Sequence, residues 1–181
     1  CPPTCGAAAA VVCSEDFARK HGLDKAVKIL AQEMTTDFTS TFEDKSMMKL
    51  IGYDMAKAAA DKVYEKAGLG PDDAQVVELH DCFTSNEIIT YSALGLCKED
   101  EMEKFVLEGN NTYGGKYVIG PSGGLLAKGH PTGATGVANL YEICAHLRGE
   151  AGQRQVKDAN IGMAHVIGLG SACGIHILEK A

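Results

Sequence analysis

Hydrophobic and polar positions follow two periods along the chain, and these predict helices and strands in turn. The short β-branched run over 74–79 predicts a buried strand. Apolar residues at 137, 140, 141, 144 and 147 predict a helix over 137–148, which Gly149 ends. Further helices are expected over 14–21, over 55–67 and from Thr84 onward. The runs 161–168 and 173–178 predict paired terminal strands with a turn over 169–172. The spacing favours an α/β layered fold with a mostly parallel sheet.

Other segments carry a weaker pattern. The small-residue run over 6–13 reads as a buried strand, and 25–34 fits a strand or a helix equally well. The polar stretch over 35–46 is typical of a loop that borders a pocket, 99–108 of an exposed acidic segment, and 150–160 of a charged linker.

Composition excludes several classes of protein. The chain has 181 residues, 45% of them hydrophobic, which is enough for one ordinary domain core. A formal charge of -7 argues against a nucleic-acid surface, because phosphate binding needs clustered Lys and Arg. No uninterrupted apolar run is long enough for a membrane span, and no secretory signal is visible.

The seven cysteines do not suggest a disulfide framework. Their number is odd and they form no Cys-x-x-Cys pair, which favours a reducing compartment. Cys1 and Cys5 have no His-x3-His partner pattern, so we expect no metal site and no tightly bound cofactor.

A single histidine lies in the most glycine-rich stretch of the chain. In the segment 123–136, five glycines and one proline surround His130, just before the predicted helix over 137–148. Glycines permit backbone positions that bring a side chain close to a ligand. Imidazole exchanges protons near neutral pH, and a helix N-terminus favours developing negative charge. The segment therefore suits proton transfer at an acyl or enolate centre, although a tight turn with a structural histidine would show the same pattern.

A second segment with side chains that can transfer protons follows the strand predicted over 74–79. His80 and Cys82 lie between that strand and the helix that Thr84 opens, a setting that can lower the pKa of a thiol. The alternative is a small buried cysteine beside a structural histidine. Asp81 is expected to be a capping or structural carboxylate.

These segments resemble the thiolases. Gly-Gly-Leu-Leu-Ala-Lys-Gly-His-Pro-Thr-Gly-Ala-Thr-Gly at 123–136 is similar to the Gly-His-Pro signature of that family. His80-Asp81-Cys82-Phe83 is similar to the sterol carrier protein X type, whose members are often peroxisomal and fused to a lipid-transfer domain. The resemblance runs through essentially the whole chain and implies the C-terminal half of a layered thiolase fold, with a mostly parallel mixed five-stranded sheet and flanking helices.

The resemblance also implies roles for individual residues. His130 would activate a nucleophilic cysteine, His80 would stabilise a thioester enolate, and Cys82 would carry the α-carbon proton. Val166-Ile167-Gly168 stands where classical thiolases have Cys-x-Gly, so Cys82 rather than Cys173 is the expected proton carrier. Four residues are expected to bind substrate or form an oxyanion hole: Ser122, Gly123, Gly129 and Gly168.

The implied organisation is a fragment of a longer enzyme. Residues 1–22 would end the N-terminal half and residues 23–181 would form the C-terminal domain, with the nucleophilic cysteine upstream and absent from this polypeptide. Acyl-CoA and CoA are the implied substrates, and the implied partners are the N-terminal half, a second copy in a homodimer and a fused lipid-transfer domain. The implied compartment is the peroxisome, with mitochondrion or cytoplasm as alternatives.

Two other functions fit the sequence. A thiolase-like aldolase could cleave a steroid side chain without an acyl-enzyme, although it would not need the histidine at position 130. A non-catalytic half could bind acyl-CoA or only complete a dimer, and the absent nucleophile favours this possibility.

Overall fold

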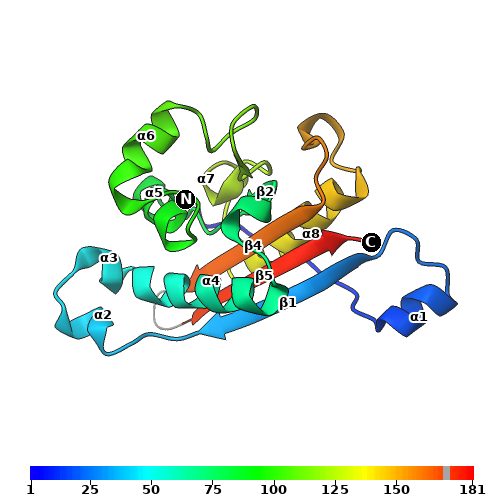
Figure 1. The fold of residues 1–181 in the computed structure, drawn as a ribbon, viewed down its shortest axis with the longest axis horizontal. Helices are drawn as coiled ribbons and strands as arrows, with labels where there is room; N and C mark the ends of the chain where they lie inside the picture. The colour runs from blue at the N-terminus through cyan, green and yellow to red at the C-terminus, as the bar shows by residue number, and fades with distance from the viewer. Residues whose placement is uncertain (169–171) are drawn as a thin grey trace.

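The computed structural model describes residues 1–168 and 172–181, and its framework is a five-stranded mixed sheet between helices (Figure 1). The strand order is β1-β5-β4-β2-β3. The strands are β1 (Val27–Thr35), β2 (Val76–Glu78), β3 (Val118–Ile119), β4 (Ile161–Gly168) and β5 (Ala172–Lys180). The predicted α/β fold is confirmed.

The sheet contains equal numbers of parallel and antiparallel pairings rather than a parallel majority. Strand β2 pairs parallel with β3 and with β4, whereas β5 pairs antiparallel with β4 and with β1. The terminal strands β4 and β5 follow each other closely in the chain and pair as a hairpin, which must be antiparallel. The turn predicted over 169–172 falls mainly on residues outside the described part of the chain.

Helices cover both faces of the sheet. The described α-helices are α1 (Glu15–Lys20), α2 (Ser40–Glu43), α3 (Met47–Leu50), α4 (Tyr53–Ala67), α5 (Thr84–Ala93), α6 (Met102–Leu107), α7 (Gly124–Lys128) and α8 (Thr135–Arg148). Three short 3₁₀ turns are η1 (Pro71–Asp73), η2 (Glu99–Glu101) and η3 (Gly152–Arg154). In Figure 1, α4 lies in front of the sheet and α8 behind it.

The alternation of side chains along each strand separates two cores. Val77 and Met163 pack with the α4 side of the sheet, whereas their neighbours Val76 and Ala164 pack with Ile143 of α8 on the other side. Successive residues of a strand point to opposite faces, so both faces of the central strands are buried. The ends of β2 and β4 are therefore fixed in position by a packed core on each face of the sheet.

The N-terminal run does not form the strand expected from its sequence. Residues 6–13 have no regular secondary structure, and Val11 is 99% exposed. An extended segment needs a neighbouring strand for its backbone groups, and the described residues supply none to this run. The division of the chain at residue 22 remains a prediction.

Three segments expected to be irregular contain short helices. Helix α7 lies inside the glycine-rich stretch, α2 lies in the polar loop over 35–46, and η2 with α6 fills the acidic segment over 99–108. Each gains buried contacts that a local pattern does not reveal, such as Leu125 in α7 and Phe105 in α6. The strand in the ambiguous region 25–34 is confirmed as β1.

Candidate active site

His80 lies at the end of β2, where its backbone is held from both sides. Its N–H donates to Nδ1 of His165 at 3.4 Å, and its carbonyl accepts a bond from the Asn86 side chain at 2.6 Å. The residue is buried, and among the described residues its Nδ1 has no hydrogen-bond partner. Burial, and secondly the neighbouring His130, lower the pKa of His80 to about 4. The ring is therefore neutral near pH 7.

His130 lies in the loop between α7 and α8, and Thr135 fixes its tautomer. Nδ1 of His130 lies 2.7 Å from the Thr135 hydroxyl oxygen, and that hydroxyl donates to the carbonyl of Pro131 at 3.2 Å. A hydroxyl has only one proton, so His130 must donate from Nδ1 to Thr135. The free lone pair is then on Nε2, which is the form required of a base.

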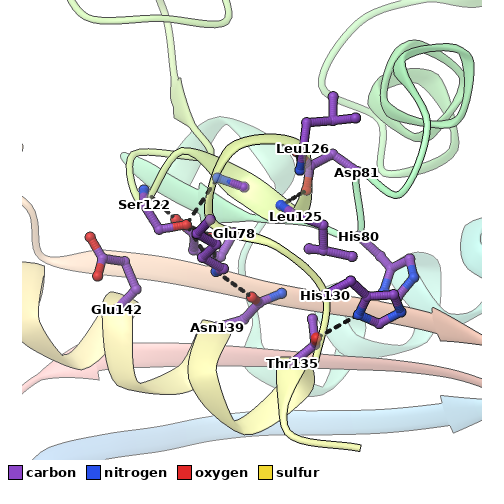
Figure 2. A network of polar contacts seen from close by, with 12 residues as sticks. Glu78, His80, Asp81, Ser122, Leu125, Leu126, His130, Thr135, Asn139 and Glu142 are labelled. Carbon is purple, nitrogen blue, oxygen red and sulfur yellow. Dashed lines mark hydrogen bonds and ion pairs between the residues drawn. The ribbon is translucent and has the colours of Figure 1, made fainter. Parts of the chain in front are cut away.

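The fold brings the two predicted histidines together. The ring centroids of His80 and His130 are 4.9 Å apart and the rings meet edge to face, at 89° (Figure 2). The two residues are fifty positions apart in the chain. The parallel pairing of β2 with β3 and β4 places their connecting segments at one edge of the sheet, where ligands of α/β folds commonly bind.

Cys82 follows two residues after His80 and is partly buried. The expectation of a lowered pKa is wrong, because burial raises the pKa of its thiol. The helix that follows begins only at Thr84, and nearby backbone bonds do not outweigh the loss of solvent. Cys82 therefore rests as a protonated thiol. Its carbonyl accepts a bond of 2.8 Å from the backbone nitrogen of Cys1.

Cys173, the alternative proton carrier, has a different environment. It is completely buried within β5, where it pairs with Thr35 and Ile167, and burial raises its pKa to about 12. Such a thiol has neither access to a ligand nor a useful acidity. Val166 is partly exposed and faces Gly136 in the first turn of α8.

The four residues expected to bind substrate or form an oxyanion hole lie in different environments. Ser122 is bound to Glu78, Gly123 is exposed before α7, and Gly129 packs against Thr4 beside His130. Gly168 ends β4 at the same edge of the sheet as His80 and lines a small depression with Leu50 and Gly52. Ser122 is thus engaged within the protein and Gly129 is buried, whereas Gly168 is exposed at the end of β4.

Three residues around the histidines were not expected at the site from the sequence, which indicated only a structural role for His165. His165, Asn86 and Thr135 bond His80 or His130 directly. His165 is fully buried, and burial lowers its pKa to about 3. Only Thr135 had a signal in the sequence, because it lies in the quoted glycine-rich motif.

The described residues contain no group of three or more His, Cys, Asp or Glu side chains that could hold a metal ion. In the same part of the chain, no helix has both the length and the apolar character needed to cross a membrane.

Comparison with known proteins decides the family. Residues 38–180 match the family described as thiolase C-terminal domain-like. The chain belongs to this family. Sterol carrier protein 2 of Rattus norvegicus is 61% identical over 95% of this thiolase-like chain, and the benzoylsuccinyl-CoA thiolase subunit BbsB of Thauera aromatica is 37% identical over 91%.

The relatives are much longer than this thiolase-like chain. It spans 32% of the rat sterol carrier protein 2 and 42% of the Thauera aromatica subunit. Among solved structures, the Ltp2-ChsH2(DUF35) aldolase superposes with a TM-score of 0.74 over 85% of this chain and 39% of its own, at 21% identity. This likeness concerns the fold. An acetyl-CoA acetyltransferase of Methanothermobacter thermautotrophicus is 37% identical over 99% of this chain and 46% of its own length.

Proposed function

We propose that this chain is the C-terminal catalytic portion of a 3-ketoacyl-CoA thiolase of the sterol carrier protein X type. The observation that carries the proposal is the contact between the imidazole rings of His80 and His130 at one edge of the sheet, with Cys82 two positions after His80. The reaction is Claisen-type cleavage, which transfers the acyl group of a 3-ketoacyl-CoA to CoA. CoA is a substrate, and no further cofactor is required.

In the proposed mechanism, Nε2 of His130 takes the proton of a cysteine supplied by the upstream half. The thiolate attacks the 3-keto carbon, and the bond between C2 and C3 breaks to give an acyl-enzyme and a thioester enolate. His80 donates a hydrogen bond to the enolate oxygen, which a neutral imidazole can do without giving up its proton. The Cys82 thiol then protonates C2 and releases acetyl-CoA or propionyl-CoA, while the shortened acyl group stays on the upstream cysteine.

The second half of the reaction restores every proton. Incoming CoA gives its thiol proton to the Cys82 thiolate and attacks the acyl-enzyme. The upstream cysteine leaves as a thiolate and recovers its proton from His130. The raised pKa of the Cys82 thiol supports its role as the proton donor to C2, because Cys82 rests with its proton in place. Val166 and Cys173 contribute no proton.

The proposed assembly is a homodimer of complete enzymes, each with an upstream half and with a lipid-transfer domain where the chain is fused to one. The proposed compartment is the peroxisome, on the resemblance to the sterol carrier protein X type.

The test is CoA-dependent cleavage of acetoacetyl-CoA and of longer 3-ketoacyl-CoA substrates. We expect no turnover by the 181-residue chain alone, because general bases cannot replace a nucleophile. Turnover should return when the upstream half is added, and should be lost again with His130→Ala. Cleavage by the purified chain alone would refute the proposal. Binding of acyl-CoA by the joined halves without turnover would favour the non-catalytic alternative, and aldol cleavage of a steroid side chain without CoA would favour the aldolase.

A further inference from the structure

Two buried carboxylates near the end of β2 bond the same short segment. Glu78 accepts the Ser122 N–H at 2.9 Å and the Ser122 hydroxyl at 2.8 Å. Asp81 accepts the N–H groups of Leu125 at 2.7 Å and Leu126 at 3.4 Å (Figure 2). The two acceptors are three positions apart in the sequence, and so are Ser122 and Leu125. We call Glu78 and Asp81 the carboxylate clamp.

The clamp holds the helix that leads directly to His130. Asp81 satisfies free N–H groups in the first turn of α7, which has only five residues. At the other end of α7, Nζ of Lys128 lies 3.6 Å from Oε2 of Glu78 and donates to the Ser122 hydroxyl at 3.0 Å. A helix of this length has little stability of its own, so its place depends on these contacts.

The clamp contacts lie close in sequence to both catalytic candidates. His80 immediately precedes Asp81, and His130 follows Lys128 by two residues. The clamp therefore joins the two segments whose rings meet 4.9 Å apart. Apart from the clamp, His165 and Asn86 bond the backbone of His80, and Thr135 bonds the ring of His130. The first residues of the chain also contact both segments, since His130 donates its N–H to Pro2 at 3.1 Å and the Cys1 nitrogen donates to the carbonyl of Cys82 at 2.8 Å.

The backbone at Gly124 is shaped around the clamp. Its φ is +63°, and a Cβ there would lie 2.0 Å from Oδ2 of Asp81. The carboxyl groups themselves are costly to bury, since Glu78 is 0% and Asp81 6% exposed, and their hydrogen bonds offset that cost. The backbone of α7 therefore lies in direct contact with the Asp81 carboxylate, with no room for a side chain at position 124.

We propose that Glu78 and Asp81 are positioning residues that set the separation of the His80 and His130 rings by holding α7 against the end of β2. The structural part of this proposal is independent of the reaction, and only its catalytic consequence rests on the proposed function.

The first test separates the segments without changing any charge. Gly124→Ala in the full chain places a methyl group against Asp81, and NMR then measures the nuclear Overhauser effect between the two imidazole rings. We expect this effect in the unaltered chain and its loss in Gly124→Ala. Gly68→Ala is the matched control, because Gly68 has a similar φ of +67° with no atom within 4 Å of the added Cβ. It should keep the effect.

The second test changes no volume. Asp81→Asn replaces an accepting oxygen by an amide group and should also weaken the ring-to-ring effect. Asp73→Asn is its control, because Asp73 likewise accepts a backbone N–H, from Gly70 at 2.7 Å, on the protein surface. Circular dichroism and a cooperative thermal transition identify folded variants, and Asp81→Asn decides the outcome where Gly124→Ala does not fold. An unchanged ring-to-ring effect in folded Asp81→Asn would overturn the proposal.

The catalytic consequence is measured in the complete enzyme. Displacing a catalytic group by about 1 Å commonly costs about 10²-fold in rate, so Asp81→Asn should lower kcat by about that factor and change KM by less than about twofold. Asp73→Asn should change neither. If the complete enzyme is inactive before any substitution while the NMR result holds, the proposed function fails and the clamp stands. If kcat falls while the ring contact is unchanged, the clamp fails and the proposed function stands.

Discussion

The Thr135 hydroxyl lies 2.7 Å from Nδ1 of His130, and this contact decides which nitrogen of the imidazole carries the proton. Because the hydroxyl donates its own proton to Pro131, it can only accept from His130. A base that is not held in one tautomer spends part of its time with the lone pair directed away from its substrate. The direction of the His130 lone pair thus depends on a residue from the first turn of α8.

Thr135→Val should remove this control of the tautomer while conserving the side-chain shape. In the complete enzyme we expect acylation of the upstream cysteine to slow by about 10- to 100-fold, a part of the roughly 10²–10⁴ that a positioned base contributes. Thr135→Ser keeps the hydroxyl and should remain within about threefold of the original rate. A single-turnover acyl-transfer assay makes the measurement, and equal rates for the two variants would contradict the assignment.

His130→Ala and His80→Ala should affect different steps. His130→Ala should abolish acylation, since no base remains for the upstream cysteine, whereas His80→Ala should mainly slow cleavage of the carbon–carbon bond by removing a donor to the enolate. The same single-turnover assay separates the steps. His21→Ala is the control, because His21 lies exposed at the end of α1. An acyl-enzyme that forms at the normal rate in His130→Ala would show that another group is the base.

Cys82→Ala should lower the rate of the complete enzyme by about 10²–10⁴, the usual effect of removing a positioned acid or base. Cys173→Ala should leave the chemistry unchanged, since Cys173 is completely buried in β5. Hydrogen–deuterium exchange at the α-carbon of bound acetyl-CoA reports the proton transfer directly. Exchange that survives Cys82→Ala and disappears in Cys173→Ala would reverse the assignment.

The acidity of Cys82 has its own test in this chain. Because burial raises the pKa of its thiol, alkylation by iodoacetamide should be slow near pH 7 and should increase at a higher pH than for an exposed cysteine. Cys5 is exposed and serves as the internal reference. Peptide mass spectrometry follows both residues together. Faster modification of Cys82 than of Cys5 at pH 7 would indicate a lowered pKa after all.

Acid should destabilise the fold through its buried histidines. His80 and His165 titrate at about 4 and about 3 in the folded chain but near the ordinary 6.5 when unfolded. As pH falls from about 6.5 towards 4, the unfolded chain therefore binds protons that the folded chain does not, and stability is lost. A pKa of His80 lowered from 6.5 to about 4 corresponds to about 3 kcal/mol of stability lost in acid.

Urea unfolding at several pH values between 7 and 4 measures this effect. His165→Asn should reduce the slope of unfolding free energy against pH in this window, whatever its effect on stability at pH 7. His21→Asn, at the exposed end of α1, should leave the slope unchanged. An unaltered slope in His165→Asn would show that His165 is already protonated in the folded chain at pH 4.

The sequence by itself determined the elements with strong local signals. Val76 to Glu78 lie in a β-branched run that favours a buried strand, and Gly149 ends α8 in a left-handed conformation, as its position predicted. The chemically distinctive His80, Cys82 and His130 were also identified from the sequence, because few residue types transfer protons and their motifs are local.

The tertiary structure decided what those residues experience. Cys82 was expected to be acidic from its place before a helix, but burial by distant segments raises its pKa. The run over 6–13 was expected to be a strand, but a strand needs a partner that its own residues do not specify. Helix α8 buries three polar residues, Asn139, Glu142 and His146, whereas the apolar-pattern residue Tyr141 is 68% exposed. The polar residues can be buried because they bond partners outside the helix, which are Lys128, Arg154 and Val156 respectively. The contact between His80 and His130 also depends on the tertiary structure. The long-range pairing of β2, β3 and β4 creates it, and no local sequence pattern predicts it.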